Sequence, residues 1–204
     1  ADVQGDLPAA RALLQDALES ARAAGARSLV LEIVAQLAEL ASRGGFELEA
    51  LDLIRDTAAR AHEVEDEAAV GWTTLLLARH EIGGDPIVGR MHLRDALERL
   101  RSRAHPGRLA TCFEFCAEVA AASGDDETAI RLLAFASSLR RAHKVAGTTN
   151  ERRRAMELRA ILERRMERSA RERGEREGRA LALDAALHRA LGEFTPLADA
   201  MVPA

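Results

Sequence analysis

Tyrosine is absent from the 204-residue chain, tryptophan occurs once, and proline occurs five times. Clusters of valine, isoleucine and aromatic residues are scarce, which argues against a sheet protein. Two cysteines are too few for a disulfide framework. The chain is rich instead in alanine, leucine, arginine and glutamate, which are strong helix formers, and hydrophobic residues make up 48% of it, too many for a disordered chain. The composition therefore predicts an all-α protein.

Long hydrophobic runs and a large charge excess are also missing. No apolar stretch approaches the about 18–20 residues that a membrane-spanning helix needs. The net charge of −4 provides no general attraction for nucleic acid or anionic membranes. No secretory leader is present, although the chain starts at Ala1 without a methionine, which leaves open a leader already removed. We expect a cytoplasmic location without membrane partners.

A short phrase that begins with glycine recurs at nearly constant spacing. It reads GDLPAA, GFELEA, GDPIVG and GDDETA, starting at Gly5, Gly45, Gly84 and Gly124, with intervals of 40, 39 and 40 residues. Glycine can close one helix in a left-handed turn, and the aspartate that follows in three of the four phrases can cap the next helix. Each phrase therefore predicts a helix start, and the four in phase predict a helix-hairpin repeat of about 40 residues.

The period divides the chain into three parts. Second helices of the repeats are expected to start near residues 5, 45, 84 and 124, so that residues 1–148 form the repeats. One long charged helix is expected over 149–173 and a short one over 180–191, separated by Gly174 and Gly178. We therefore predict a capping helix pair over 149–191, a tail or linker over 192–204, and about nine helices in all.

These features resemble degenerate tetratricopeptide (TPR) repeats. The closing phrase EGRALALDAALHRAL is similar to the end of the C-terminal helical-repeat region of bacterial multidomain regulators, which are STAND-type ATPases fused to LuxR-type or SARP-type DNA-binding domains, cyclases or kinases. The matching places are Glu177, Gly178, Arg179, Leu181, Ala185 and Leu187. The resemblance implies an αα-superhelix of TPR-like hairpins. Because the phrase at Gly5 begins a second helix, we expect its partner helix and the rest of a larger chain to lie upstream.

Residues that commonly perform catalysis or hold metals do not group in the sequence. His80-Glu81 begins like a zinc-protease motif, but Gly84 stands where the second histidine is required. Cys112 and Cys116 are four residues apart on one expected helix and are interpreted as small core residues. We therefore expect no cofactor, no metal and no enzymatic activity, while an active site assembled with upstream domains stays open.

The resemblance also implies where a partner binds, since the first helix of each TPR pair lines the inner surface. The candidate partner-binding residues on that face are Glu32, Glu39, Trp72, Arg79, Glu114 and Glu118. Four glutamates and a tryptophan suit an extended basic or amphipathic peptide. The predicted function is a non-enzymatic protein-interaction or ligand-sensing scaffold within a larger bacterial signalling or transcriptional regulator. The alternative interpretation is that these residues are solvated and Trp72 is core.

Two further hypotheses remain. Residues 151–179 contain eleven arginines and seven glutamates, which allows either a nucleic-acid-contacting helix or a solvated helix with ion pairs four residues apart. No aromatic residues interleave with the arginines, so nucleic acid is the less favoured partner. The first helix, residues 6–24, has a wide apolar stripe, which predicts a homodimer through this helix. The stripe comprises Leu7, Leu13, Leu14, Ala17 and Leu18.

Overall fold

The computed structural model describes residues 7–44, 47–103 and 105–192, and every regular element in these ranges is a helix. The helices are α1 (Leu7–Ala23), α2 (Arg27–Gly44), α3 (Glu47–Glu63), α4 (Glu67–Glu81), α5 (Pro86–Arg103), α6 (Pro106–Ala122), α7 (Asp126–Ala142), α8 (Thr149–Arg165), α9 (Arg168–Ala180) and α10 (Leu183–Gly192). The all-α prediction is confirmed, with ten helices in these ranges instead of about nine. The expected tail beyond Gly192 lies outside the described residues, as do Gly5 and Gly45.

Four helices begin two residues after the glycines of the recurring phrase. They are α1, α3, α5 and α7, which start at Leu7, Glu47, Pro86 and Asp126. At α7 the Asp125 carboxylate accepts a hydrogen bond from the Thr128 N–H at 2.9 Å. At α5 the Asp85 carboxylate accepts from the N–H groups of Ile87 and Val88 at 3.1 and 3.2 Å. These bonds satisfy amides that have no partner within the first helical turn.

Four helices end in a left-handed residue. Positive φ angles of 65°, 53°, 86° and 54° occur at Gly25, Glu65, Gly124 and Lys144, which follow α1, α3, α6 and α7. In each case the next N–H donates to the carbonyl five residues back, as from Asp66 to Ala61 at 2.9 Å. This is the Schellman arrangement, which satisfies carbonyls at a helix end. Gly84 does not have a positive φ, so only Gly124 among the described phrase glycines makes the expected left-handed turn.

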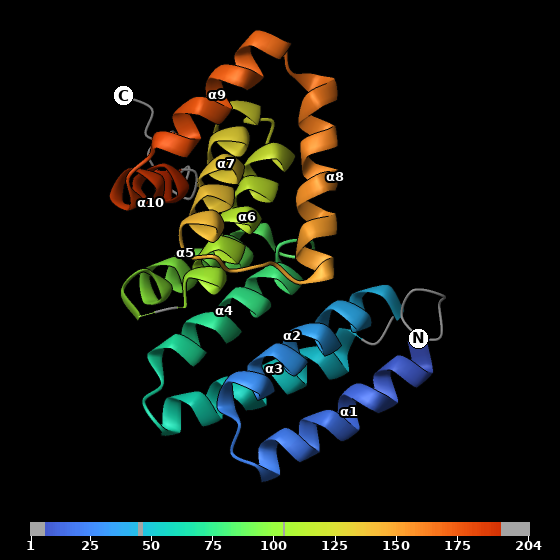
Figure 1. Ribbon diagram of the computed structural model, residues 1–204. Helices are drawn as coiled ribbons and strands as arrows, with labels where there is room; N and C mark the ends of the chain where they lie inside the picture. The colour runs from blue at the N-terminus through green and yellow to red at the C-terminus, as the bar shows by residue number, and fades with distance from the viewer. Residues whose placement is uncertain (1–6, 45–46, 104, 193–204) are drawn as a thin grey trace, which may run out of the picture. The chain divides into compact units, whose positions relative to one another are not determined.

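The N-terminal unit spans Ala1–Leu100. Its helices pack mainly on their sequence neighbours, α1 on α2, α2 on α3 and α3 on α4 (Figure 1). Val34, Ile54 and Leu75 from α2, α3 and α4 are fully buried at its centre. The Trp72 indole N–H donates to the Leu31 carbonyl at 3.3 Å, which joins α4 to α2. Packing between sequence neighbours is thus shown, whereas the TPR-like superhelix stays a prediction.

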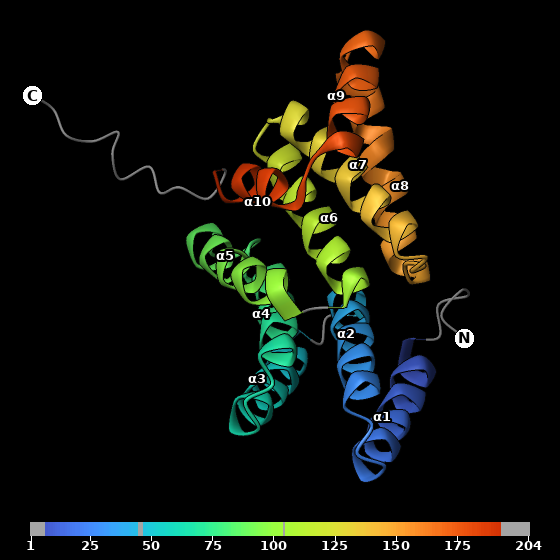
Figure 2. The same ribbon diagram turned by 60° about the vertical axis from the view of Figure 1, so that its left-hand side comes forward.

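The C-terminal unit spans Arg101–Ala204 and is built around α7. Helices α6, α8, α9 and α10 all contact α7, and Figure 2 shows α6 and α8 beside it. The rings of Phe113 and Phe135 meet edge to face with centroids 4.9 Å apart, and Phe113 is fully buried. Aromatic pairs of this geometry add to the stabilisation from burial alone. The core of this unit therefore lies between α6 and α7.

The segment after residue 148 differs from the expected helix pair. Helix α8 ends at Arg165 because Met166 has extended backbone angles, and α9 then runs through Gly174 and Gly178. Both glycines are buried and face α7: a Cβ at Gly174 would lie 2.5 Å from the Ile130 Cγ2, and one at Gly178 would overlap the Arg131 carbonyl oxygen. The glycines therefore do not break the helix but let α9 approach α7 closely. Three helices result instead of two.

Candidate functional site

The four predicted site residues of the N-terminal unit lie on α2 and α4. Glu32 is exposed on α2, and Glu39 and Arg79 are half-buried. Trp72 is only 6% exposed, and its indole N–H is already hydrogen-bonded within the unit. The structure therefore presents Trp72 as a core residue, in line with the alternative interpretation from the sequence.

The two predicted site residues of the C-terminal unit lie on α6. Glu114 is 8% exposed and accepts hydrogen bonds from the Arg140 Nε and Nη2 at 2.8 and 3.0 Å. The Arg140 guanidinium also lies 3.4 Å from the Glu151 carboxylate, so this cluster joins α6, α7 and α8. Burial lowers the pKa of Arg140, but Glu114 and Glu151 outweigh it and the net pKa is raised. Glu118 is half-buried, 3.9 Å from Arg154.

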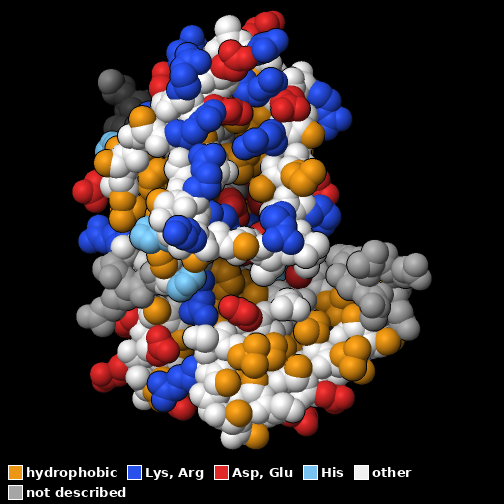
Figure 3. Space-filling model, viewed as in Figure 1, with side chains coloured by type: hydrophobic (Ala, Val, Ile, Leu, Met, Phe, Trp, Pro, Cys, Tyr) orange, Lys and Arg blue, Asp and Glu red, His pale blue; other side chains and the backbone are white. Residues whose placement is uncertain are grey.

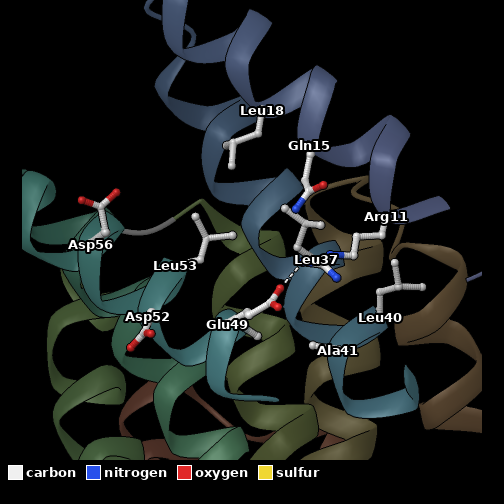
Figure 4. Close-up of a pocket in the computed structure, with 11 residues that line it drawn as sticks. Arg11, Gln15, Leu18, Leu37, Leu40, Ala41, Glu49, Asp52, Leu53 and Asp56 are labelled. Carbon is white, nitrogen blue, oxygen red and sulfur yellow. Dashed lines mark hydrogen bonds and ion pairs between the residues drawn. The ribbon is translucent and has the colours of Figure 1, made fainter. Parts of the chain in front are cut away.

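A hollow lies along α2, between α1 and α3 (Figure 4). Its volume is about 390 Å³. Leu37, Leu40 and Ala41 of α2 line it together with Leu18 of α1 and Leu53 of α3. Its polar lining residues are Arg11, Gln15, Glu49, Asp52 and Asp56. The hollow therefore combines an apolar interior with an acidic edge supplied by α3.

A second hollow of about 270 Å³ lies farther along the same three helices and reaches the start of α4. Val30 and Leu31 of α2 contribute to its apolar lining, with Val64, the residue that follows α3. We call the two hollows together the α1–α3 groove. Arg22 of α1 lines the second hollow and Asp56 of α3 lines the first, and these side chains form an ion pair at 3.0 Å.

Two exposed ion pairs join α1 to α3 across the groove, and apolar residues border it. Arg11 and Glu49 form a second ion pair between α1 and α3, drawn in Figure 4. Asp52 is 81% exposed at its side chain, and its recorded ion pair, with Arg55, is a long one at 3.7 Å. Figure 3 shows hydrophobic side chains gathered on the face formed by the first helices. Leu48 of α3 is 79% exposed, and Val64, which follows α3, is 50% exposed.

None of the predicted site residues lines the α1–α3 groove. Helical geometry puts Glu32 and Glu39 on the side of α2 opposite Leu37 and Ala41. The sequence prediction missed the groove because the TPR resemblance assigned partner binding to the opposite face of α2. A usable signal was nevertheless present, since Glu49, Asp52 and Asp56 follow helical spacing beside the apolar Leu53.

The arginine-rich stretch forms many local ion pairs. Arg153, Arg168 and Arg179 each pair with a glutamate four residues away. This favours the interpretation as a solvated, paired helix surface over a continuous nucleic-acid patch. The structure divides the stretch between α8 and α9, so its arginines lie on two separate helices.

The cysteines and the possible metal ligands are placed as follows in the described ranges. Cys112 and Cys116 are free and fully buried in α6, as predicted for core residues. Burial and the neighbouring Cys112 raise the pKa of the Cys116 thiol well above its usual value, which keeps it protonated and unreactive. Within the described ranges, no three His, Cys, Asp or Glu side chains are placed to hold a metal ion, and no helix has the length and apolar character to cross a membrane.

Comparisons with protein-family models, curated proteins and solved structures find no match to this chain. The resemblance to regulator repeat regions stays a prediction. The candidate site is thus defined by geometry and charge alone.

Proposed function

We propose that the protein is a non-enzymatic interaction module that binds a basic, amphipathic helical segment of a partner protein in the α1–α3 groove. The observation that carries the proposal is the groove itself, with apolar lining from three helices and a row of acids along α3. Grooves of this kind bind the apolar face of an amphipathic helix. The module would belong to a larger bacterial signalling or transcriptional regulator, as the sequence resemblance implies.

The dimensions of the groove support a helical ligand. Its lining on α3 extends from Glu49 to Ala61, which corresponds to about 18 Å along the helix axis. Between three and four turns of a bound helix have the same length, so apolar side chains three or four residues apart could contact Leu53 in one hollow and Val30 in the other.

The charges of the groove support a basic ligand. Asp52 lines the groove and is 81% exposed at its side chain, and its long ion pair with Arg55 leaves room for a lysine or arginine of the ligand. The exposed pairs of Arg11 with Glu49 and Arg22 with Asp56 contribute little to stability, because exposed ion pairs are typically worth about 0–1 kcal/mol. Breaking these two ion pairs, so that Glu49 and Asp56 can pair with arginines of a ligand instead, therefore costs little free energy.

The test is fluorescence anisotropy with the full chain and two labelled designed peptides of about 16 residues. Both carry leucines at three- and four-residue spacing, one with lysines and arginines elsewhere and one with glutamates. We expect only the basic peptide to bind. Asp52→Lys should weaken binding about tenfold, whereas Glu98→Lys, an equal charge change on an exposed α5 side chain, should leave it unchanged. Equal binding of the acidic peptide, or equal loss in both variants, would contradict the proposal.

Self-association is a second candidate, favoured by one observation. Leu13 of α1 is 63% exposed, and Ala17, one turn farther along, is also exposed. A second copy of α1 would cover this face, as the apolar stripe of the sequence predicts. Light scattering at increasing concentration should show a dimer whose mass falls to that of the monomer in Leu13→Glu. A monomer at every concentration, or a dimer unaffected by the substitution, would exclude this contact.

A further inference from the structure

A small hollow in the C-terminal unit brings together arginines from three helices. It has a volume of about 200 Å³ and is lined by Ala134, Ser137, Arg141, Arg159, Glu175 and Arg179. Arg141 is near the end of α7, Arg159 lies in α8 and Arg179 lies in α9. Figure 3 shows arginine side chains concentrated over α8 and α9 on the visible face. We call this hollow the three-arginine pocket.

Of the three arginines, only Arg179 pairs with a carboxylate in the part of the chain that the structure describes. The Arg179 Nη2 donates to the Glu175 carboxylate at 2.6 Å, and its Nε donates to the Glu175 carbonyl. Among the residues that the structure describes, Arg141 donates only to the uncharged Ser138 hydroxyl, at 3.4 Å. Arg159 has neither an ion pair nor a side-chain hydrogen bond to any residue that the structure describes. The pocket therefore retains about two positive charges without an acidic partner.

The walls of the pocket are held in place independently of these arginines. Gly174 and Gly178 bring α9 against α7, and Arg131 of α7 donates to the Glu177 carboxylate of α9 at 2.7 Å. The cluster of Arg140 with Glu114 and Glu151 joins α7 to the first turn of α8. The backbone supports of all three guanidinium groups thus exist before any ligand binds, which lowers the entropic cost of binding.

We propose that the three-arginine pocket binds the phosphate group of a small phosphorylated molecule. A phosphomonoester carries a charge of about −1.5 to −2 at neutral pH, which matches the two arginine charges left without an acid. Guanidinium groups present paired N–H donors that fit phosphate oxygens bidentately. The Ser137 hydroxyl supplies a further donor at the same wall.

The pocket fits a compact phosphomonoester better than a nucleic-acid strand. A phosphodiester has one charge per phosphate, and base binding uses aromatic side chains, which are absent from the lining residues. A volume of about 200 Å³ accommodates a phosphate and a small attached group. This binding is separate from the peptide binding proposed for the N-terminal unit.

The test is isothermal titration calorimetry of the full chain with inorganic phosphate, phenyl phosphate and a single-stranded oligothymidylate. We expect saturable one-to-one binding of phenyl phosphate. Arg141→Gln and Arg159→Gln should each weaken it about tenfold. Arg164→Gln is the matched control, because Arg164 is exposed on the same helix as Arg159, does not line the pocket, and donates to the Ala160 carbonyl. Circular dichroism should show unchanged helix content in all three variants.

Each result separates the ligand classes. Binding of inorganic phosphate alone would support the site and identify the free ion as its ligand. Lack of saturable binding of either phosphate compound, or an equal loss in Arg164→Gln, would overturn the proposal. Tighter binding of the oligothymidylate, with affinity falling steeply as salt increases, would overturn it in favour of a nucleic-acid surface.

Discussion

The two units are built from helices of similar length, yet they differ in how completely neighbouring helices cover their apolar side chains. In the C-terminal unit, α7 is covered by α6, α8, α9 and α10. In the N-terminal unit, a groove stays open on α2, and this unit contains six of the seven large hydrophobic residues that are exposed among those described. The difference shows that helix-forming sequence alone does not produce a closed core.

Of the changes that test this difference between the units, removing a buried charge partner from the C-terminal unit should lower the free energy of unfolding most. In Glu114→Leu, Arg140 keeps Glu151 nearby but loses its two shortest ion-pair bonds. We expect the free energy of unfolding to fall by about 3 kcal/mol. Urea unfolding followed by circular dichroism measures it. In Glu157→Leu, an exposed acid on α8, the change should stay within about 0.5 kcal/mol. Similar losses in both variants would show that the buried cluster does not stabilise the unit.

Filling the α7–α9 contact should have the next largest effect. In Gly178→Ala the new methyl group would lie 2.8 Å from the Arg131 Cα, so backbone must move. Overpacking of this kind costs about 2 kcal/mol, despite the better helix propensity of alanine. Gly83→Ala in the N-terminal unit is the control, because no heavy atom lies within 4 Å of its added Cβ. If thermal unfolding shows Gly178→Ala to be as stable as Gly83→Ala, the tight contact is disproved.

These two sites also show what the sequence could and could not predict. The helix starts at Pro86 and Asp126 follow from caps and glycines within a few residues, so local pattern suffices. Gly178 was misinterpreted as a helix break because its partner, Arg131, lies 47 positions earlier, and no local signal reports that contact. Glu114 likewise depends on Arg140, 26 residues away. Contacts between residues far apart in the sequence determine the roles of Gly178 and Glu114. Such contacts also form the α1–α3 groove, which the sequence did not predict.

Removing one helix cap from each unit should lower the free energy of unfolding by a smaller amount, and by the same amount in both units. Asp66 accepts a hydrogen bond from the Ala69 N–H at 3.0 Å in the N-terminal unit, and Asp125 accepts one from Thr128 at 2.9 Å in the C-terminal unit. We expect Asp66→Ala and Asp125→Ala each to lower the free energy of unfolding by about 1 kcal/mol. Equal losses in urea would assign the difference between the units to tertiary packing. A twofold difference would place part of it in the caps.

The smallest effect concerns acid stability of the α7–α9 contact. The hydrogen bond and charge of Arg131 lower the pKa of Glu177 below its ordinary value of 4.5. Because the folded-state pKa is the lower one, ionised Glu177 stabilises the fold above about pH 4.5, and this contribution disappears as pH falls through the lowered pKa. Carboxylates titrate between roughly pH 6 and pH 3. Over this range the free energy of unfolding of Glu177→Gln should therefore fall by less than that of the parent chain. Parallel pH profiles of urea midpoints would contradict this.

The single tryptophan has a consequence for any spectroscopic study of the chain. Because tyrosine is absent and Trp72 belongs to the N-terminal unit, ultraviolet fluorescence excited at the indole band reports on that unit alone. Its hydrogen bond to Leu31 places the emitting ring beside the helix that lines the α1–α3 groove. Circular dichroism, by comparison, sums the helices of both units. Comparing the two signals therefore allows the unfolding of the N-terminal and C-terminal units to be followed separately, without attaching a dye.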